Sequence, residues 1–202
     1  MFSHDSSSPQ GGGHTQPMTR QPRGHIGPRD REVYARVPAR GIGKGVTDNV
    51  FLGYALNGVD PKGRLSIPAD YRAVLGRRSG DEAILISLHE RADCLIACDV
   101  GQGAREFAKL HERYGAAETA ESDQAARLAL GSATRAAYDA NGRIVLPADL
   151  RDLSGIKDCA FFMGVGDRFE IWNPHTLVGL PGLDPRLVRL VRRHIEQRKG
   201  GA

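Results

Sequence analysis

The chain has 202 residues, of which 40% are hydrophobic, and a formal net charge of +4 at pH 7. A chain of this length holds one domain, or one domain with tails. It contains no run of about eighteen apolar residues and no apolar signal-peptide core, so we expect no membrane segment and a cytoplasmic location. Its three cysteines do not make a disulfide framework, and we expect buried free thiols and no bound metal.

Residues 1–48 are rich in Gly, Pro, Ser, Gln and His and poor in apolar side chains, so we expect a disordered tail. The loose spacing of His4, His14 and His25 favours a polar tail over a metal site. The tail holds seven Lys/Arg and four Asp/Glu, whereas residues 49–202 hold 21 and 20. Because the rest of the chain is nearly neutral, nucleic-acid binding would have to rest on local clusters of basic residues.

Residues 50–59 predict a first strand, and a motif of thirteen residues follows it. Residues 60–72 read DPKGRLSIPADYR, and residues 139–151 repeat them as DANGRIVLPADLR, with seven identical positions and an offset of 79. Such a match indicates an internal duplication. In both copies an Asp stands three residues before a Gly, which is typical of a tight turn, because Asp accepts backbone N–H groups and Gly tolerates a positive φ. We therefore assign turn-anchoring roles to Asp60, Gly63, Asp139 and Gly142.

Polar and apolar residues alternate over residues 64–67, which predicts a half-buried strand. Pro68 suits the first turn of a short helix that ends near Gly76. Each copy of the motif thus predicts a strand, a turn, a second strand and a short helix. Lys62 and Arg64 would lie at the tip of the resulting hairpin.

Between the two copies the sequence predicts two strands, at residues 83–88 and 94–97, and two helices, at 101–114 and 121–130. Around the second copy it predicts three more strands, at residues 132–138, 159–165 and 168–172. The aromatic residues of these strands are expected in the core or at a subunit contact: Phe161, Phe162, Phe169 and Trp172.

Asp184 and Pro185 predict the start of an amphipathic helix over residues 185–198. Its basic residues lie mostly on one face: Arg186, Arg189, Arg192, Arg193 and Arg198. We favour a solvated face for them, with contact to a partner or to DNA as the second interpretation.

The two motif copies, together with GVGDRFEIW at residues 164–172, resemble the MraZ family of bacterial transcriptional regulators. The resemblance covers roughly residues 50–177. It implies a mixed β/α fold, namely a swapped-hairpin AbrB-like β-barrel built from two pseudo-symmetric repeats with short helices. We accordingly expect a tail at 1–48, an MraZ-like domain at 49–180 and a basic C-terminal helix at 181–202. The domain would consist of a first half at 50–100, a helical connection at 101–131 and a second half at 132–180.

The resemblance also implies a function: a repressor of its own division and cell-wall gene cluster, associated with the nucleoid. MraZ proteins form closed rings that bind direct repeats in promoter DNA, so the expected partners are double-stranded DNA and further copies of the chain. No cofactor is implied.

The residue roles follow from the shape and charge of the tips. A narrow hairpin can enter the major groove, where arginine binds guanine with two hydrogen bonds and lysine serves as a phosphate anchor. We assign DNA binding to Lys62 and Arg64. For Arg143 a structural role and a DNA role are equally favoured, because Asn141 replaces the lysine of the first copy. Further phosphate candidates are Arg72, Arg77 and Arg78, with an ion pair to Asp70 or to a neighbouring subunit as the alternative for Arg72.

Other classes of protein fit less well. The chain has no Ser/His/Asp order, P-loop or HExxH motif, so we predict that it is not an enzyme. An antitoxin-like AbrB-type protein, which binds DNA together with a protein partner, is the main alternative. A purely structural ring protein gives no reason for a basic tip.

Overall fold

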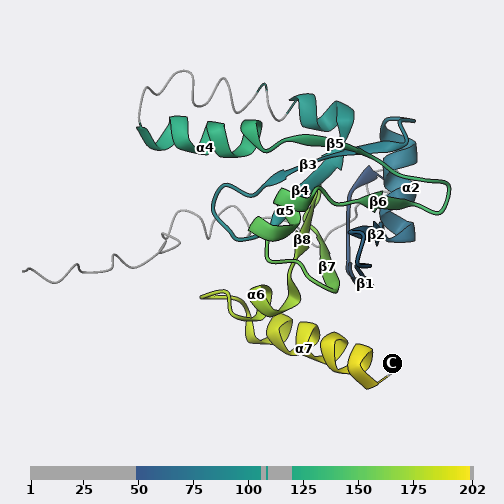
Figure 1. Cartoon of the computed structure of the whole chain (residues 1–202), viewed down its shortest axis with the longest axis vertical. Helices are drawn as coiled ribbons and strands as arrows, with labels where there is room; N and C mark the ends of the chain where they lie inside the picture. Colours follow the sequence, from purple (N-terminus) through teal and green to yellow (C-terminus); the bar gives the residue numbers. More distant parts are fainter. Residues whose placement is uncertain (1–48, 106–107, 109–119, 201–202) are drawn as a thin grey trace, which may run out of the picture. The chain divides into compact units, whose positions relative to one another are not determined.

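A computed structural model describes residues 49–105, 108 and 120–200 (Figure 1). The chain divides into two units, Met1–Pro38 and Ala39–Ala202, and all described residues belong to the second. The predictions of a disordered tail at 1–48 and of a helix through residue 114 lie wholly or partly outside this region. Residues 100–105 are helical.

The described strands form an antiparallel sheet of six strands in the order β1-β7-β8-β4-β3-β5. The fold is therefore mixed α/β with an antiparallel sheet, as predicted. The sheet has two ends, at β1 and β5, so the closed barrel stays a prediction. The strands are β1 (Tyr54–Gly58), β3 (Ala83–Leu88), β4 (Leu95–Asp99), β5 (Thr134–Ala137), β7 (Cys159–Gly164) and β8 (Phe169–Trp172).

The order of the strands is symmetric. If each strand of one half is replaced by the equivalent strand of the other half, the order read from β5 becomes the order read from β1. The first strand of each half, β1 or β5, pairs with a strand that follows the motif of the other half, β7 or β3. The strands β4 and β8 pair with each other at the centre. The two halves are therefore joined by reciprocal strand pairing rather than stacked as separate sheets.

A second sheet contains the strands of the two motifs, β2 (Arg64–Ser66) and β6 (Arg143–Val145). These strands are antiparallel, and Leu65 pairs with Ile144, which occupies the same motif position. A local two-fold axis therefore passes through this pair. Both side chains are buried, whereas Arg64 and Val145 point outward, as the alternation of a strand requires.

The pairing of β2 with β6 corrects the predicted hairpin. Residues 50–59 and 64–67 were expected to form the two strands of one hairpin, but between them only a single bridge joins Val59 to Leu65. The turn of residues 60–63 instead connects two sheets. The alternating pattern identifies the buried face of a strand, but it does not identify the strand with which it pairs.

The helix after the first motif is longer than predicted. Helix α2 (Ala69–Arg78) includes Gly76, which was expected to end it, and begins after Pro68. A glycine inside a helix costs about 1 kcal/mol, which the burial of Val74 and Leu75 offsets. Besides α2 and the helical residues 100–105, the described helices are α4 (Ala120–Gly131), α5 (Ala148–Leu153), α6 (Pro174–Val178) and α7 (Pro185–Gly200).

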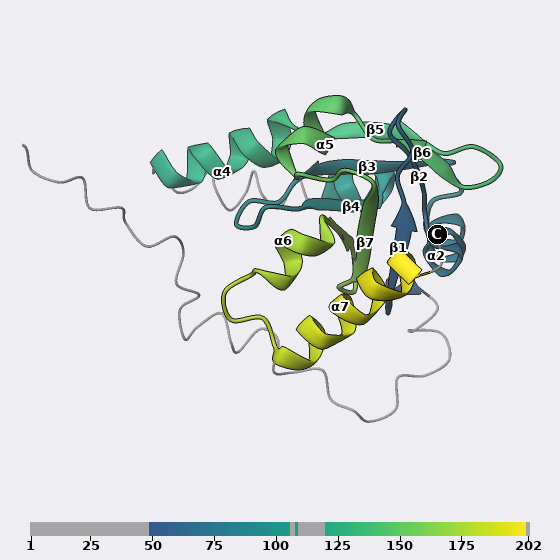
Figure 2. The same cartoon turned by 60° about the horizontal axis from the view of Figure 1, so that its bottom comes forward.

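Two hydrophobic clusters hold these elements together. The larger one lies around Phe51, Tyr71, Phe162 and Phe169, whose rings make edge-to-face and tilted contacts. The smaller one joins α6 and α7 to β7 and β8 through Phe161, Trp172, Leu177 and Val191 (Figure 2). The predicted burial of the four aromatic residues is thus confirmed. Within the described region, no helix is both long and apolar enough to cross a membrane.

Candidate nucleic-acid interface

The first tip, residues 60–64, is a turn built around the carboxylate of Asp60. Its Oδ1 accepts hydrogen bonds from the backbone N–H groups of Lys62 and Arg64, both at 2.9 Å. Its Oδ2 accepts a hydrogen bond from Arg64 Nε. Gly63 has a φ of +77°, and its N–H donates to the Asp60 carbonyl at 2.9 Å. The Asp, the Gly and the Arg of the motif are therefore parts of one turn.

The second tip, residues 139–143, repeats this geometry. Asp139 Oδ1 accepts from the N–H groups of Asn141 and Arg143 at 2.9 and 3.0 Å, and Gly142 has a φ of +72°. Arg143 holds Asp139 Oδ2 more fully, with Nε at 2.9 Å and Nη2 at 2.8 Å. Arg64, in contrast, contacts its aspartate through Nε, and its terminal nitrogens make no hydrogen bond in the described region.

Both aspartates are held in the ionised form. The backbone N–H of Arg64, followed by its guanidinium, lowers the pKa of Asp60. The guanidinium of Arg143, followed by its backbone N–H, lowers the pKa of Asp139. A carboxylate that accepts several hydrogen bonds is a poor proton donor at neutral pH. The hydrogen bonds that lower these pKa values are also the ones that hold the two turns.

The two tips are linked by reciprocal hydrogen bonds. Leu146 N–H donates to the Gly63 carbonyl at 2.9 Å, and Ile67 N–H donates to the Gly142 carbonyl at 2.8 Å. These two bonds are equivalent under the local two-fold axis. Each glycine turn is thus fixed by the strand that follows the other tip.

Arg72 and Arg151 pack across the turns of the opposite repeat. A methyl group on Gly142 would lie 2.1 Å from Arg72 Cδ, and one on Gly63 would lie 3.4 Å from Arg151 Nη1. In the described region Arg72 Nε is buried and has no hydrogen-bond partner, and no ion pair joins Arg72 to Asp70. Arg72 is therefore placed to support the second tip.

Arg78 is committed to contacts inside the protein. Its side chain is 12% exposed and lies 3.2 Å from the buried carboxylate of Asp99. It also donates to the carbonyls of Asn49 and Asp167 and lies over the ring of Phe51. These contacts do not favour the predicted phosphate role for Arg78. The neighbouring Arg77 is exposed.

The exposed cations of the two tips differ. Lys62 is exposed, and the side chain of Arg64 is 48% exposed. The second tip presents Arg143, with a side chain 42% exposed, and a neutral Asn141. The first tip therefore carries two cations with one carboxylate, and the second carries one of each.

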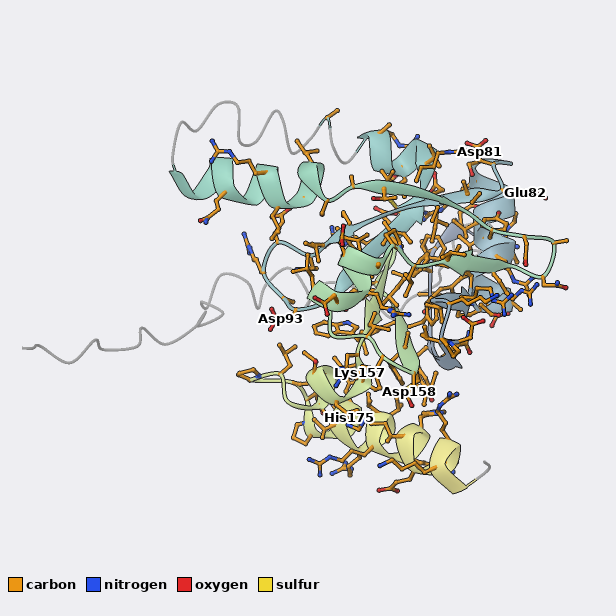
Figure 3. The ribbon with its side chains drawn as sticks, in the orientation of Figure 1. Asp81, Glu82, Asp93, Lys157, Asp158 and His175 are labelled. Carbon is orange, nitrogen blue, oxygen red and sulfur yellow. The ribbon has the colours of Figure 1, made fainter. Side chains whose placement is uncertain are left out.

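The residues beside the start of each tip, here called its base, increase this difference in charge. Sequence patterns did not single them out. Val59 N–H donates to the Asp158 carbonyl at 2.8 Å, and the equivalent Tyr138 N–H donates to the Glu82 carbonyl at 3.0 Å. The first base thus carries exposed Lys157 and Asp158, whereas the second carries exposed Asp81 and Glu82 (Figure 3). Lys157 and Asp158 lie 76 residues after Asp81 and Glu82. The motif copies are 79 residues apart, so their alignment does not place these two pairs at equivalent positions.

No metal site emerges from the side chains that the structure describes, because they contain no group of three or more His, Cys, Asp or Glu residues suited to an ion. An open hollow of about 570 Å³ lies beside the first tip, and Arg151 and Lys157 contribute to its lining. The combination defines a class of protein: a duplicated α/β domain that presents two paired turns, of which the first is basic.

Comparison with known proteins identifies the family. Residues 129–177 match the model of the family described as "MraZ protein, putative antitoxin-like". The chain is 37% identical over 130 residues to the Transcriptional regulator MraZ of Rickettsia felis. The aligned region covers 63% of this chain and 84% of the relative. It is 38% identical to that of Rickettsia akari over the same shares, and 36% identical over 131 residues to that of Rickettsia bellii. The chain belongs to the MraZ family, as the resemblance of its motifs predicted.

Proposed function

We propose that this protein is a transcriptional regulator that binds double-stranded DNA with its first tip. The observation that supports this most directly is the exposure of Lys62 and Arg64 on a turn that Asp60 holds rigid. The major groove is about 12 Å wide and admits so narrow a turn. The relatives that carry the name Transcriptional regulator MraZ support the same function.

Arg64 is the residue that reads bases. Its terminal nitrogens are uncommitted within the described region, so they can donate to O6 and N7 of guanine, a pair of bonds worth about 1–3 kcal/mol of discrimination. Lys62 positions the tip on a phosphate, since an ammonium group is a point charge without a fixed fork of donors. Arg143 is held by Asp139 through two nitrogens and plays the structural part.

Assembly supplies the affinity that one tip lacks. A single tip makes few contacts, and binding near the non-specific range of about 10⁻⁴–10⁻⁶ M is expected of it. Several tips that engage spaced repeats raise the overall affinity through effective concentration. We infer that copies of the chain form a closed ring through head-to-tail contacts and bind direct repeats in the promoter of their own gene cluster, which they repress. Each subunit is an AbrB-like swapped-hairpin unit located in the cytoplasm with the nucleoid.

The test is an anisotropy titration on labelled DNA from upstream of the gene, beside a scrambled duplex, at two salt concentrations. Wild-type protein should prefer the upstream DNA and keep that preference at the higher salt. Arg64→Ala should lose the preference by at least tenfold while the oligomer persists. Arg143→Ala is the matched control, since it removes the equivalent side chain at the second tip, and it should keep the preference.

Equal, salt-sensitive binding of wild-type protein to both duplexes would contradict this function. That result would favour the antitoxin-like alternative, which the description of the matching family model also mentions. A protein of that kind needs its protein partner for full DNA binding, so the purified chain alone would show no preference.

A further inference from the structure

Helix α7 ends at the base of the first tip. Arg198 Nη2 donates to the Asp158 carbonyl at 3.1 Å, and this carbonyl also accepts the N–H of Val59, the residue before the tip. A methyl group on Gly58 would lie 3.1 and 3.2 Å from the two terminal nitrogens of Arg198. Figure 3 shows Asp158 beside the C-terminal part of α7. The helix is therefore tied to the segment that carries Lys62 and Arg64.

The apolar face of α7 is already covered. Val191 is fully buried and belongs to the cluster that contains Phe161 and Leu177. The ring of His194 lies 5.3 Å from that of Tyr54 in an edge-to-face arrangement. The helix is thus held against the sheet along its length, and only its opposite face is open to a partner.

That opposite face is cationic. Arg189, Arg192, Arg193 and Lys199 are exposed, and their spacings of three, four and seven residues place them on one side of a helix. In the described region none of them forms a hydrogen bond or an ion pair, whereas Arg186 is paired with Asp184 at 2.6 Å. The sequence of α7 contains a single acidic residue, Glu196.

Among the described residues, the second tip has no helix tied to its base in this way. The base of the second tip presents Asp81 and Glu82. The carbonyl of Glu82 accepts the N–H of Tyr138, whereas the equivalent carbonyl of Asp158 accepts both the N–H of Val59 and the guanidinium of Arg198. The helix that carries these four cations is therefore tied, through Arg198, to the base of the first tip. Such an arrangement fits an extended polyanion that already touches the first tip.

We propose that α7 is a second DNA-binding element, whose exposed cations bind backbone phosphates of the duplex that receives the first tip. This inference rests on the proposed function. A helix of sixteen residues extends about 24 Å, enough to follow several phosphates. Contacts to phosphates position a protein on DNA without reading its sequence, and arginine forms them with two donors. An anionic membrane does not fit, because such surfaces take up the apolar face of a basic helix, which is buried here.

The experiment measures how DNA affinity depends on salt. The full chain and the variant Arg189→Gln/Arg193→Gln are titrated against upstream and scrambled duplexes from 50 to about 300 mM salt. Each lost phosphate contact lowers the slope of log K against log salt by about 0.9, so the variant should lose about 2 from the slope. Its ratio of upstream to scrambled affinity should stay unchanged. The matched control is Arg127→Gln/Arg135→Gln, which removes the same charge from exposed positions on α4 and β5 and should keep the wild-type slope.

Three outcomes would overturn the role of α7: an unchanged slope in the α7 variant, an equal loss in both variants, or loss of binding to phosphatidylserine vesicles instead of DNA. The melting temperature of the α7 variant should match that of the wild type, because Arg189 and Arg193 are exposed and form no hydrogen bond or ion pair in the described region. The failure of the proposed function looks different, since the wild-type protein would then show no preference for the upstream duplex. A variant Arg192→Gln/Lys199→Gln, tested in parallel, should lower the slope by a similar amount.

Discussion

At the scale of single residues, one arrangement occurs three times. Asp60, Asp139 and Asp184 each accept a hydrogen bond from the backbone N–H two residues later, and each also contacts an arginine of the same segment. At the tips this arrangement stiffens a turn, and at Asp184 it caps helix α7. All three carboxyls have a lowered pKa, because these donors stabilise the charged form.

The cap of α7 predicts a pH dependence. Hydrogen bonds from the Arg186 side chain and then from its backbone lower the pKa of Asp184 from 3.8 to about 2. Because the unfolded chain then binds the proton more readily, the carboxylate stabilises the fold above about pH 4, and this contribution is lost as the pH falls towards 2. Urea unfolding of wild-type protein and Asp184→Asn from pH 6 to 2.5 should show a difference that disappears in acid.

Arg186→Gln provides the control for this measurement. It keeps the carboxylate but removes its strongest donor. The free energy of unfolding of Arg186→Gln should therefore differ less from that of Asp184→Asn than the wild-type value does, at every pH. A difference that stays constant from pH 6 to 2.5 would show that the charge of Asp184 does not contribute to stability.

At the scale of elements, Arg78 joins segments that are distant in the sequence. From the end of α2 it reaches the last residue of β4, the turn between β7 and β8, and the segment before β1. Asp99, its partner on β4, is 1% exposed, so loss of the guanidinium would leave a buried carboxylate without its cation.

Arg78→Ala should therefore lower the free energy of unfolding by about 3 kcal/mol, as is typical when one partner of a buried pair is removed. Chemical unfolding at pH 7 measures this loss. Arg77→Ala, at the exposed neighbouring position, should lower the free energy by less than about 1 kcal/mol, because the interactions of an exposed charged side chain contribute little. Equal effects of the two substitutions would mean that the contacts of Arg78 do not stabilise the fold.

Local features of these elements could be predicted from the sequence, whereas contacts between distant residues could not. The turns at Asp60 and Asp139 and the start of α7 at Pro185 depend on neighbouring residues, and local patterns suffice to predict them. The pairing of β2 with β6 depends on residues 79 positions apart, and an alternating pattern says nothing about it. Arg78 follows Arg77 in a polar stretch that resembles a turn. Only the approach of Asp99 and Asp167 distinguishes a buried arginine from an exposed one.

At the scale of the whole molecule, three large aliphatic side chains of the described region are more than half exposed. Leu153 on α5 is 64% exposed, Val145 on β6 is 59% exposed and Leu52 is 55% exposed. Exposed apolar patches with polar borders commonly mark contacts between proteins. We place one side of the proposed subunit contact at Leu153, the most exposed of them, because Val145 pairs with Arg64 and therefore lies beside the first tip.

Leu153→Glu should therefore reduce the mass of the assembly, measured by light scattering after size exclusion, while the melting temperature of the subunit stays within a few degrees. The reason is that a buried carboxylate at a subunit contact is costly, whereas the same group on a free surface is hydrated. Leu128→Glu, on the 38% exposed Leu128 of α4, should leave the mass unchanged. If the mass of the Leu153 variant is also unchanged, the contact lies elsewhere.

The reciprocal pairing of the strands has a consequence for synthesis on the ribosome. Strand β1 has its partner in β7, about a hundred residues further along the chain. At roughly 5–20 residues per second, β1 would wait about 5–20 seconds for that partner to be made. During this time the first half exposes an apolar, unpaired strand edge, which favours association with other nascent chains. The halves of this protein therefore mature together, after nearly all of the chain has been translated.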